Sequence, residues 1–448
     1  MPELEQRRPL LQLWARATAL ARQMRAQWRA VTSPAADQPG SWLEHHDFVL
    51  NCVGRFGVTI ASQIQAVAIG WFVYAMTGSG VALGLVGLAA FLPAIVLMLV
   101  TGYASDRYDR RLVLALCCAL MTFATLGQLV LVSIGSSHMW PLYLTVVLYG
   151  AGRAFYLPAS SAILPNLVPQ AEFGRAVAFS TAVSQAANIS GPAVGGLLYA
   201  IDERLPFAGA LAFYALGSLS NWAISYRSKG NASAVPSSLV HLLAGFRFML
   251  EKPVVLGAIT LDLFVVVLGG SVALLPIFAK DVLDVGPVGL GILRSGPAAG
   301  ALLVGMILAR WNFMERQAGP RMFKAVAIFG LANLGFGLST SFYLSLFYLA
   351  LMGAADTASV VVRMTLVQAE TPDGLRGRVA AVSSLCTAFS NEIGQFRAGT
   401  MASVIGAVPA VIVGGGGAIA VAALWRHWFP DLRARDHLVR EAADKPRM

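Results

Sequence analysis

Twelve long apolar runs are the feature that most constrains the fold of this 448-residue chain. Each run has close to the ~20 residues that an α-helix needs to cross the hydrocarbon core of a bilayer. They lie at approximately Phe48–Met76, Val81–Tyr103, Leu112–Ile134, Trp140–Leu164, Ala176–Ile201, Leu205–Tyr226, Val254–Ala279, Gly289–Arg310, Phe323–Thr340, Phe342–Val367, Val379–Ile405 and Ala407–Trp428. A polar stretch at Arg227–Ser238 separates the first six runs from the last six. The sequence therefore predicts an all-α membrane protein with twelve transmembrane helices in two six-helix halves.

The same pattern predicts the segments of the chain. They are a cytoplasmic N-terminal arm at 1–46, a six-helix bundle at 47–226, a cytoplasmic central loop at 227–253, a second six-helix bundle at 254–428 and a cytoplasmic tail at 429–448. Within the arm, apolar residues from Leu10 to Val31 recur at helical spacing beside Arg22, Arg25 and Arg29. This pattern is typical of an amphipathic helix that lies on a membrane surface. A disordered arm is the alternative.

The distribution of positive charge predicts the orientation. Charged residues make up only 12% of the chain, against about 25% in soluble proteins. Of the 33 Lys and Arg residues, 26 fall in the arm, the tail and the loops on one side of the predicted helices. Because basic residues concentrate on the cytoplasmic side, we expect a multi-pass protein of the inner (plasma) membrane with both termini in the cytoplasm. The net charge of +10 then reflects membrane orientation and not nucleic-acid binding.

The sequence carries no signature of catalysis or of cofactor binding. All four cysteines lie in apolar runs without metal-ligand spacing. No Gly-x-x-x-x-Gly-Lys-Ser/Thr loop is present, which excludes ATP hydrolysis by that route. We therefore expect a protein that is not an enzyme and that uses no metal and no cofactor.

The short loop between the second and third runs contains a charged motif. Its motif residues are Gly102, Asp106, Arg107, Arg110 and Arg111. Their spacing resembles the signature between helices 2 and 3 of the major facilitator superfamily, with Asp109 where the general pattern has glycine. The resemblance implies a gating loop, in which Asp106 meets the start of helix 11 near Gly377 when the cytoplasmic side is closed.

A second motif, Gly-Pro-Ala-Val-Gly-Gly, lies in the fifth run. Proline bends a helix, and glycines let a neighbouring helix approach closely. Residues Gly191, Pro192, Gly195 and Gly196 resemble the Gly-Pro-x-x-Gly-Gly motif of superfamily antiporters, which are usually exporters. The resemblance implies export, and generic helix packing is the alternative.

The two halves of the chain share an internal repeat. A shift of 203 positions aligns Pro169 with Pro372, Asn188 with Asn391, and Gly196 with Gly399, among other pairs. Parallel repeats of this kind place a substrate site near the bilayer midplane, between two halves that rock against each other.

The longest resemblance runs from Gly353 to Gly414. It includes Asp356 to Val379 and the stretch Asn391-Glu-Ile-Gly394, and Trp71 to Gly78 fits the same pattern. The order of these residues is similar to the branch of the superfamily that contains the enterobactin exporter, with relatives in macrolide and tetracycline efflux. The resemblance implies a secondary active exporter and covers most of residues 48–428.

Eight charged residues lie inside the apolar runs and not at their ends, and each costs about 2.5–3.5 kcal/mol on insertion scales. They are Arg55, Arg153, Asp262, Arg294, Asp356, Arg363, Glu392 and Arg397. We expect Arg55, Arg153, Arg294 and Arg363 to line the substrate cavity and the three carboxylates to be the candidates for proton coupling. Snorkelling to the interface is the alternative for Arg55 and Arg363. All three acids belong to the second half, whereas the runs of the first half contain only the positive charges of Arg55 and Arg153. A cavity between the halves would have one cationic wall and one titratable wall, which favours an anionic or mixed polar-aromatic substrate such as a catecholate, hydroxamate or carboxylate chelator.

Helical spacing suggests a ranking among the carboxylates. Asp356 and Arg363 are seven residues apart and share a helix face, so Arg363 is expected to hold Asp356 in an ion pair. Glu392 has no such partner, because Arg397 lies five positions away on another face. We therefore favour Glu392 as the proton carrier, unless Arg153 or Arg294 lies beside it.

The function that fits these features is export of a small molecule, a siderophore, by proton antiport. An antibiotic or multidrug efflux transporter of the same fold is the alternative. Import is a further alternative. A membrane-embedded enzyme or sensor would need a catalytic constellation or an appended domain, and neither is visible in the sequence. The expected partners are the small-molecule substrate, protons and the lipid bilayer, without nucleic acid, and the expected state is a monomer.

Overall fold

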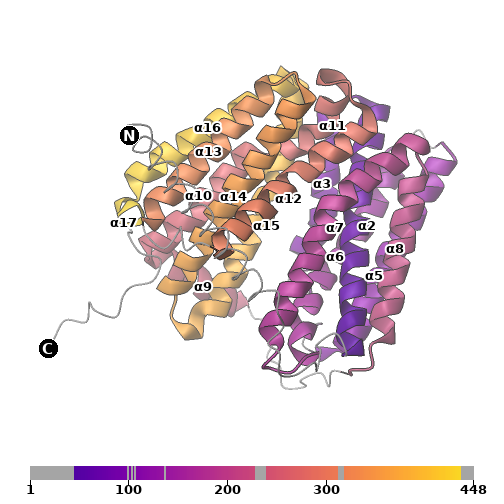
Figure 1. Ribbon diagram of the computed structural model, residues 1–448, viewed down its shortest axis with the longest axis horizontal. Coiled ribbons are helices and arrows are strands. Elements are labelled where there is room, and N and C mark those ends of the chain that lie inside the picture. The colour runs from indigo at the N-terminus through magenta and orange to yellow at the C-terminus, as the bar shows by residue number, and fades with distance from the viewer. Residues whose placement is uncertain are drawn as a thin grey trace, which may run out of the picture. The chain divides into compact units, whose positions relative to one another are not determined.

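A computed structural model describes residues 45–97, 100–101, 104, 107–135, 138–227, 239–310 and 317–434. Residues 1–44 of the predicted N-terminal arm, Gly102 and Asp106 therefore lie outside the described residues. Every regular element in the described ranges is a helix (Figure 1). Those of the first half are α2 (His46–Thr77), α3 (Gly80–Val96), α5 (Arg110–Ser133), α6 (Trp140–Ile163), η2 (Leu164–Asn166), α7 (Phe173–Ile201) and α8 (Leu205–Ala223).

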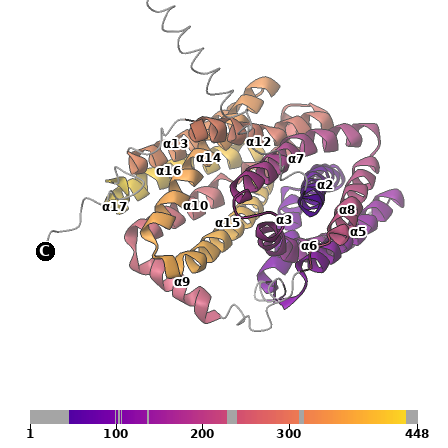
Figure 2. The ribbon, with the colours of Figure 1, turned by 60° about the horizontal axis from the view of Figure 1, so that its bottom comes forward.

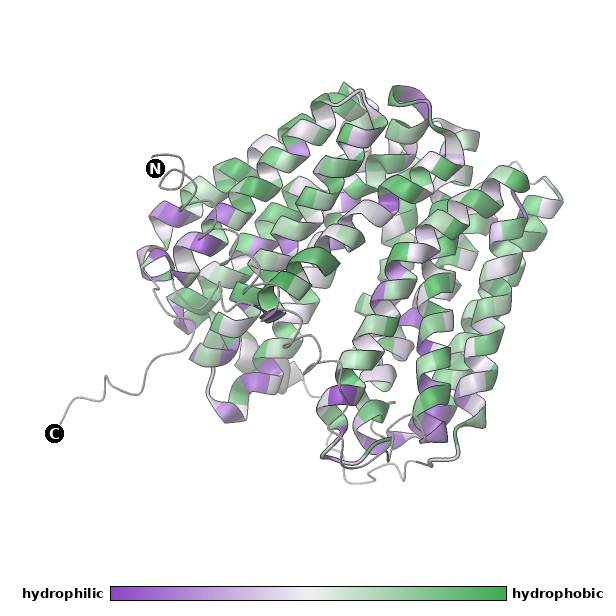
Figure 3. Ribbon diagram, in the orientation of Figure 1, coloured by the Kyte–Doolittle hydropathy of each residue, from purple (hydrophilic) through white to green (hydrophobic). Residues whose placement is uncertain are grey.

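The described elements of the second half are also helices, and the helix that begins with α10 is interrupted. Its elements are α9 (Leu239–Glu251), α10 (Pro253–Gly269), η3 (Ser271–Leu274), α11 (Leu275–Ile277), η4 (Phe278–Val282), α12 (Gly286–Arg310), α13 (Ala318–Leu338), α14 (Phe342–Glu370), η5 (Asp373–Leu375), α15 (Arg376–Ile405), α16 (Ala407–Trp428) and α17 (Pro430–Arg433). Seven stretches in the described ranges are long and apolar enough to cross a membrane, and one of them, Pro253–Val282, runs from α10 to η4. Hydrophobic residues dominate the helices in Figure 3. The all-α membrane fold is confirmed, while the count of twelve spans and the segment boundaries stay predictions.

The interruption after α10 is stabilised by Arg397 of α15. A helix end leaves its last carbonyl groups without intrahelical partners, and a cation is favourable beside them. Arg397 Nε donates to the Val267 carbonyl at 2.8 Å, and Nη2 donates to the Leu268 carbonyl. Arg397 thus satisfies backbone groups that lipid could not hydrogen-bond.

Two helix crossings connect the first half to the second, α7 with α12 and α3 with α15 (Figure 2). A methyl group added at Gly196 would collide with the Pro287 carbonyl oxygen of α12. One added at Gly399 would collide with the Gly80 carbonyl oxygen of α3. Gly196 and Gly399 are the pair that the 203-residue shift aligns, so the internal repeat produces equivalent contacts on the two sides of the structure.

The Gly196 crossing leads to a stability prediction. Gly196→Ala should lower the free energy of unfolding by about 1–3 kcal/mol, because α7 and α12 must separate to admit the methyl group. Thermal unfolding in detergent measures the change. Gly416→Ala is the matched control, since Gly416 is a helical glycine with nothing within 4 Å of the added carbon. Equal stability of the two variants would contradict a tight crossing at Gly196.

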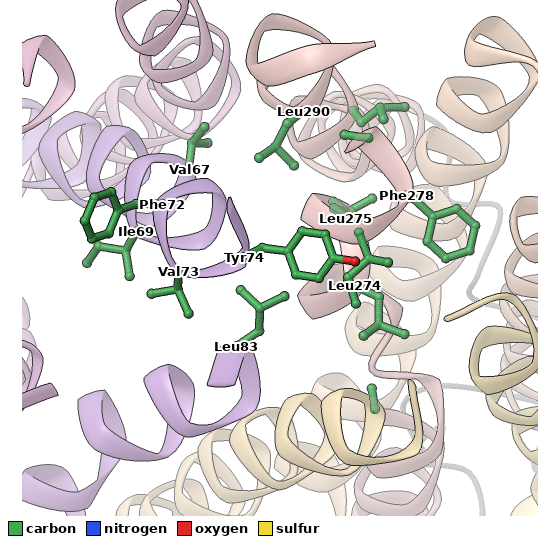
Figure 4. Packing of buried hydrophobic residues seen from close by; sticks show 14 of the residues in the cluster. Val67, Ile69, Phe72, Val73, Tyr74, Leu83, Leu274, Leu275, Phe278 and Leu290 are labelled. Carbon is green, nitrogen blue, oxygen red and sulfur yellow. The ribbon is translucent and has the colours of Figure 1, made fainter. Parts of the chain in front are cut away.

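A hydrophobic cluster joins the halves at the end of the bundle where α2 meets α3. Leu83 from the first half belongs to the same buried cluster as Leu275, Phe278 and Leu290 from the second (Figure 4). The hydroxyl group of Tyr74, in the same cluster, donates a hydrogen bond to the Asp281 carboxylate across the halves. These contacts close this end of the interface, which we call the Tyr74 end.

Arginines of the charged loop are anchored at the opposite end. Asp109 caps the N-terminus of α5 and accepts a hydrogen bond from the Arg111 backbone N–H at 3.1 Å, which explains an acid where the general motif has glycine. Arg110 Nη1 donates to the Ala162 carbonyl at 2.9 Å, and Arg111 Nη1 donates to the Ile224 carbonyl at 2.8 Å. Both arginines therefore hold helix ends of the first half together.

Candidate functional site

A cavity of about 610 Å³ lies between the two halves. Its polar lining residues include Gln63, Tyr149, Arg153 and Asn188 of the first half and Arg294, Asn391, Glu392 and Gln395 of the second half. Apolar residues such as Phe91 and Val146 complete the wall. A cavity of this size, with apolar walls and converging polar groups, is typical of a site for a small molecule.

Three charged side chains face this cavity from three helices. Arg153 of α6, Arg294 of α12 and Glu392 of α15 all contribute to the lining. Both arginines interact electrostatically with the Glu392 carboxylate. Within the described part of the chain, no N···O distance of 4.0 Å or less joins Glu392 to either arginine. The charges therefore act on one another through the cavity without a locked ion pair, and their sum is one positive charge.

A buried hydrogen-bond network supports the first-half wall of the cavity. The Tyr149 hydroxyl donates to Ser62 Oγ at 3.1 Å, and Ser62 is also hydrogen-bonded to the Tyr214 hydroxyl at 3.0 Å. Tyr214 donates to Gln65 Oε1 at 2.8 Å, and Gln65 Nε2 donates to Gln128 at 2.6 Å. This network links α2, α5, α6 and α8, so the wall beside Arg153 has fixed geometry.

A second charged cluster lies in the second half, among residues that do not line the cavity. Asp262 of α10 forms an ion pair with Arg363 of α14, and their side chains are 9% and 5% exposed. Thr387 of α15 donates a hydrogen bond to Asp262 Oδ2 at 3.2 Å. Asp356 interacts electrostatically with both Asp262 and Arg363. Its carboxylate has neither a hydrogen bond nor an ion pair to any other described residue. With all three groups ionised, the cluster carries one negative charge.

This geometry corrects two premises of the sequence analysis. Arg363 pairs with Asp262 and not with Asp356, because seven residues along α14 correspond to about 10 Å of helix rise. Arg363 is also buried in that pair, which rules out snorkelling. Glu392 does have cationic neighbours, Arg153 and Arg294, which come from other helices and cannot be found by spacing along α15.

Some of the charged residues predicted as site residues line the cavity, and others do not. Of the four arginines expected in the cavity, Arg153 and Arg294 line it, whereas Arg55 and Arg363 do not. Arg55 donates from Nε to Ser184 Oγ on α7 at 2.9 Å. Among the carboxylates only Glu392 lines the cavity.

Uncharged polar residues of the cavity escaped the sequence analysis as site residues. Gln63, Tyr149 and Gln395 are polar residues within apolar runs, and this location could have identified them as cavity residues. Asn188 and Asn391 had a stronger signal, because the internal repeat aligns them. Gln63 Nε2 donates to Asn188 Oδ1 at 2.9 Å, which fixes one amide at the wall. In the described ranges, no group of three His, Cys, Asp or Glu side chains is arranged to hold a metal ion.

Comparison with known proteins agrees with this architecture. The chain is 26% identical over 386 residues to the enterobactin exporter of Shigella dysenteriae serotype 1, covering 83% of this chain and 87% of that protein. It is 23% identical over 366 residues to macrolide efflux protein A of Streptococcus pyogenes, covering 78% and 87%. Among solved structures, an inward-facing bacterial homologue of the iron transporter ferroportin matches with a TM-score of 0.65 at 18% identity, covering 88% of this chain and all of that one.

A family model described as transmembrane secretion effector matches residues 46–448. The match includes every helix that lines the cavity and both crossings between the halves. The chain therefore belongs to the transmembrane secretion effector family of major facilitator transporters.

Proposed function

We propose that this protein exports an anionic small molecule of the siderophore class from the cytoplasm, coupled to proton entry. The observation that carries the proposal is the pair of arginines, Arg153 and Arg294, facing one cavity from opposite halves. A guanidinium group binds carboxylate and catecholate oxygens through a planar fork of N–H donors. The likeness to the enterobactin exporter supports the same substrate class.

The remaining lining suits a chelator with aromatic or amide groups. Gln63, Asn188, Asn391 and Gln395 offer amide donors and acceptors beside the apolar wall. Phe91 contributes an aromatic surface, and its ring packs against Phe389 across the halves with centroids 6.5 Å apart. Such a site accommodates a catecholate or hydroxamate ligand better than a compact inorganic ion.

Proton coupling fits the second charged cluster better than the cavity. Glu392 has two cations, Arg153 and Arg294, as electrostatic neighbours. Asp356 shares the single cation Arg363 with Asp262, so one negative charge of the cluster remains without a cation. A proton neutralises that charge. The proposed carrier is therefore Asp356, in place of Glu392, with Asp262 as its partner acid.

The proposed orientation has both termini in the cytoplasm and the Tyr74 end facing outward. In this arrangement the halves are joined on the outer side by Tyr74 and Asp281, and substrate enters the cavity from the cytoplasm. Rocking of the halves about the two glycine crossings would then expose the cavity on the other side.

A flux assay tests the proposal. Purified protein in proteoliposomes should accelerate movement of metal-free enterobactin and of a hydroxamate chelator, and an imposed pH gradient should increase the rate. Empty liposomes give the background rate. Movement of erythromycin or tetracycline but of neither chelator would favour antibiotic efflux, for which the Glu392 carboxylate offers a counter-ion to an amine. If none of these compounds moves faster than in empty liposomes, both siderophore export and antibiotic efflux are contradicted.

A further inference from the structure

We infer that Glu392 is an internal counter-ion, a tethered carboxylate that stands in for the anionic group of the substrate while the cavity is empty. The inference rests on the proposed function and assigns a role to one residue of the same cavity. The two cavity arginines lack a direct anionic partner, because Arg153 and Arg294 make no hydrogen bond or ion pair to any other described residue. Two such guanidinium groups require a nearby anion when water is excluded.

The position of Glu392 matches this role. Its carboxylate comes from α15, whereas the two arginines come from α6 and α12. Glu392 Oε2 would lie 3.0 Å from a carbon added at Gly87 of α3, so the carboxylate lies at the α3–α15 crossing between the halves. A group at this crossing can stay near cations from both halves while the halves move.

The attachment of Glu392 is weak enough for exchange. The one described hydrogen bond to its carboxylate comes from Gln395 Nε2 at 3.4 Å, near the limit of a useful bond. Neither arginine is within direct ion-pair distance. An entering anion can therefore take both guanidinium groups without breaking a short ion pair, and Glu392 can return when that anion leaves.

The role has a consequence for the transport cycle. The loaded carrier has its cations compensated by the substrate, and in the empty carrier Glu392 compensates one of the two positive charges. Both forms can then pass through the closed intermediate in which the cavity loses contact with water. Without the carboxylate, the loaded carrier still reorients, but the empty carrier is held back by two uncompensated cations.

Glu392→Gln separates these two steps in proteoliposomes. With metal-free enterobactin as the probe, exchange of internal for external substrate should stay within about twofold of wild type, while net efflux into substrate-free buffer falls about tenfold or more. Apparent affinity for the probe should rise. Glu392→Asp should recover part of the net efflux, and Glu203→Gln, which removes an exposed acid outside the cavity, should change neither rate.

Parallel loss of exchange and net efflux in Glu392→Gln would overturn the inference, as would normal rates in both modes. A readout without substrate separates this failure from failure of the proposed function. Spin labels at Thr77 of α2 and at Asp284 after η4 report the separation of the halves at the Tyr74 end. The empty wild-type protein should populate two separations, and empty Glu392→Gln should populate one. Identical distance distributions in the two empty proteins would contradict the counter-ion role, whichever compound is transported.

Discussion

Arg363→Met is expected to lower the free energy of unfolding by about 3–5 kcal/mol. The substitution keeps the volume of the side chain but leaves Asp262 buried without its cation, with Asp356 as a second acid nearby. Removing one partner of a buried ion pair costs more than the pair itself contributes, because the remaining charge cannot be solvated. Thermal and chemical unfolding of the purified protein in detergent measure the change.

Two controls make this result specific. Adding Asp262→Asn to Arg363→Met removes the orphaned charge and should restore most of the lost stability. Arg247→Met breaks an exposed ion pair with Glu251, whose side chains are 83% and 58% exposed, and should change stability by less than about 1 kcal/mol. If the double variant is as unstable as Arg363→Met alone, the loss comes from packing and not from charge.

The second large effect is expected for Asp356→Asn, which should remove the acceleration of transport by a pH gradient. A neutral amide has almost the shape of the carboxylate but cannot take up and release a proton. The gradient-driven rate should fall about tenfold or more, while slow transport down a substrate gradient persists. The measurement compares initial rates in proteoliposomes with and without an imposed gradient. Insertion and unfolding of the variant serve as checks on folding.

Glu392→Gln provides the contrast to this variant. If Glu392 is a counter-ion, the remaining exchange activity of Glu392→Gln keeps its response to the gradient, whereas Asp356→Asn loses it. The reverse pattern would assign the proton to Glu392, as helical spacing alone suggested. A full response in both variants would contradict proton coupling through either carboxylate.

Much of this architecture could be read from the chain alone. Apolar length predicts membrane-spanning helices because the bilayer fixes the number of residues required. The 203-residue repeat predicted that Gly196 and Gly399 are equivalent, and the structure places both at crossings between the halves. The free-energy cost of charge in lipid identified the Asp, Glu and Arg residues of the cavity and of the second charged cluster.

What only the tertiary structure decided is how those charges are shared. Spacing along one helix finds neighbours on the same face, and it suggested Asp356 for Arg363 and no partner for Glu392. The actual neighbours come from other helices, and which faces meet depends on close approaches that no single helix encodes. The interruption after α10, closed by Arg397 of α15, has the same origin. The sequence by itself therefore determined the membrane helices, their repeat and the set of charged residues within them. Helix packing decided which of these charges lie close to one another.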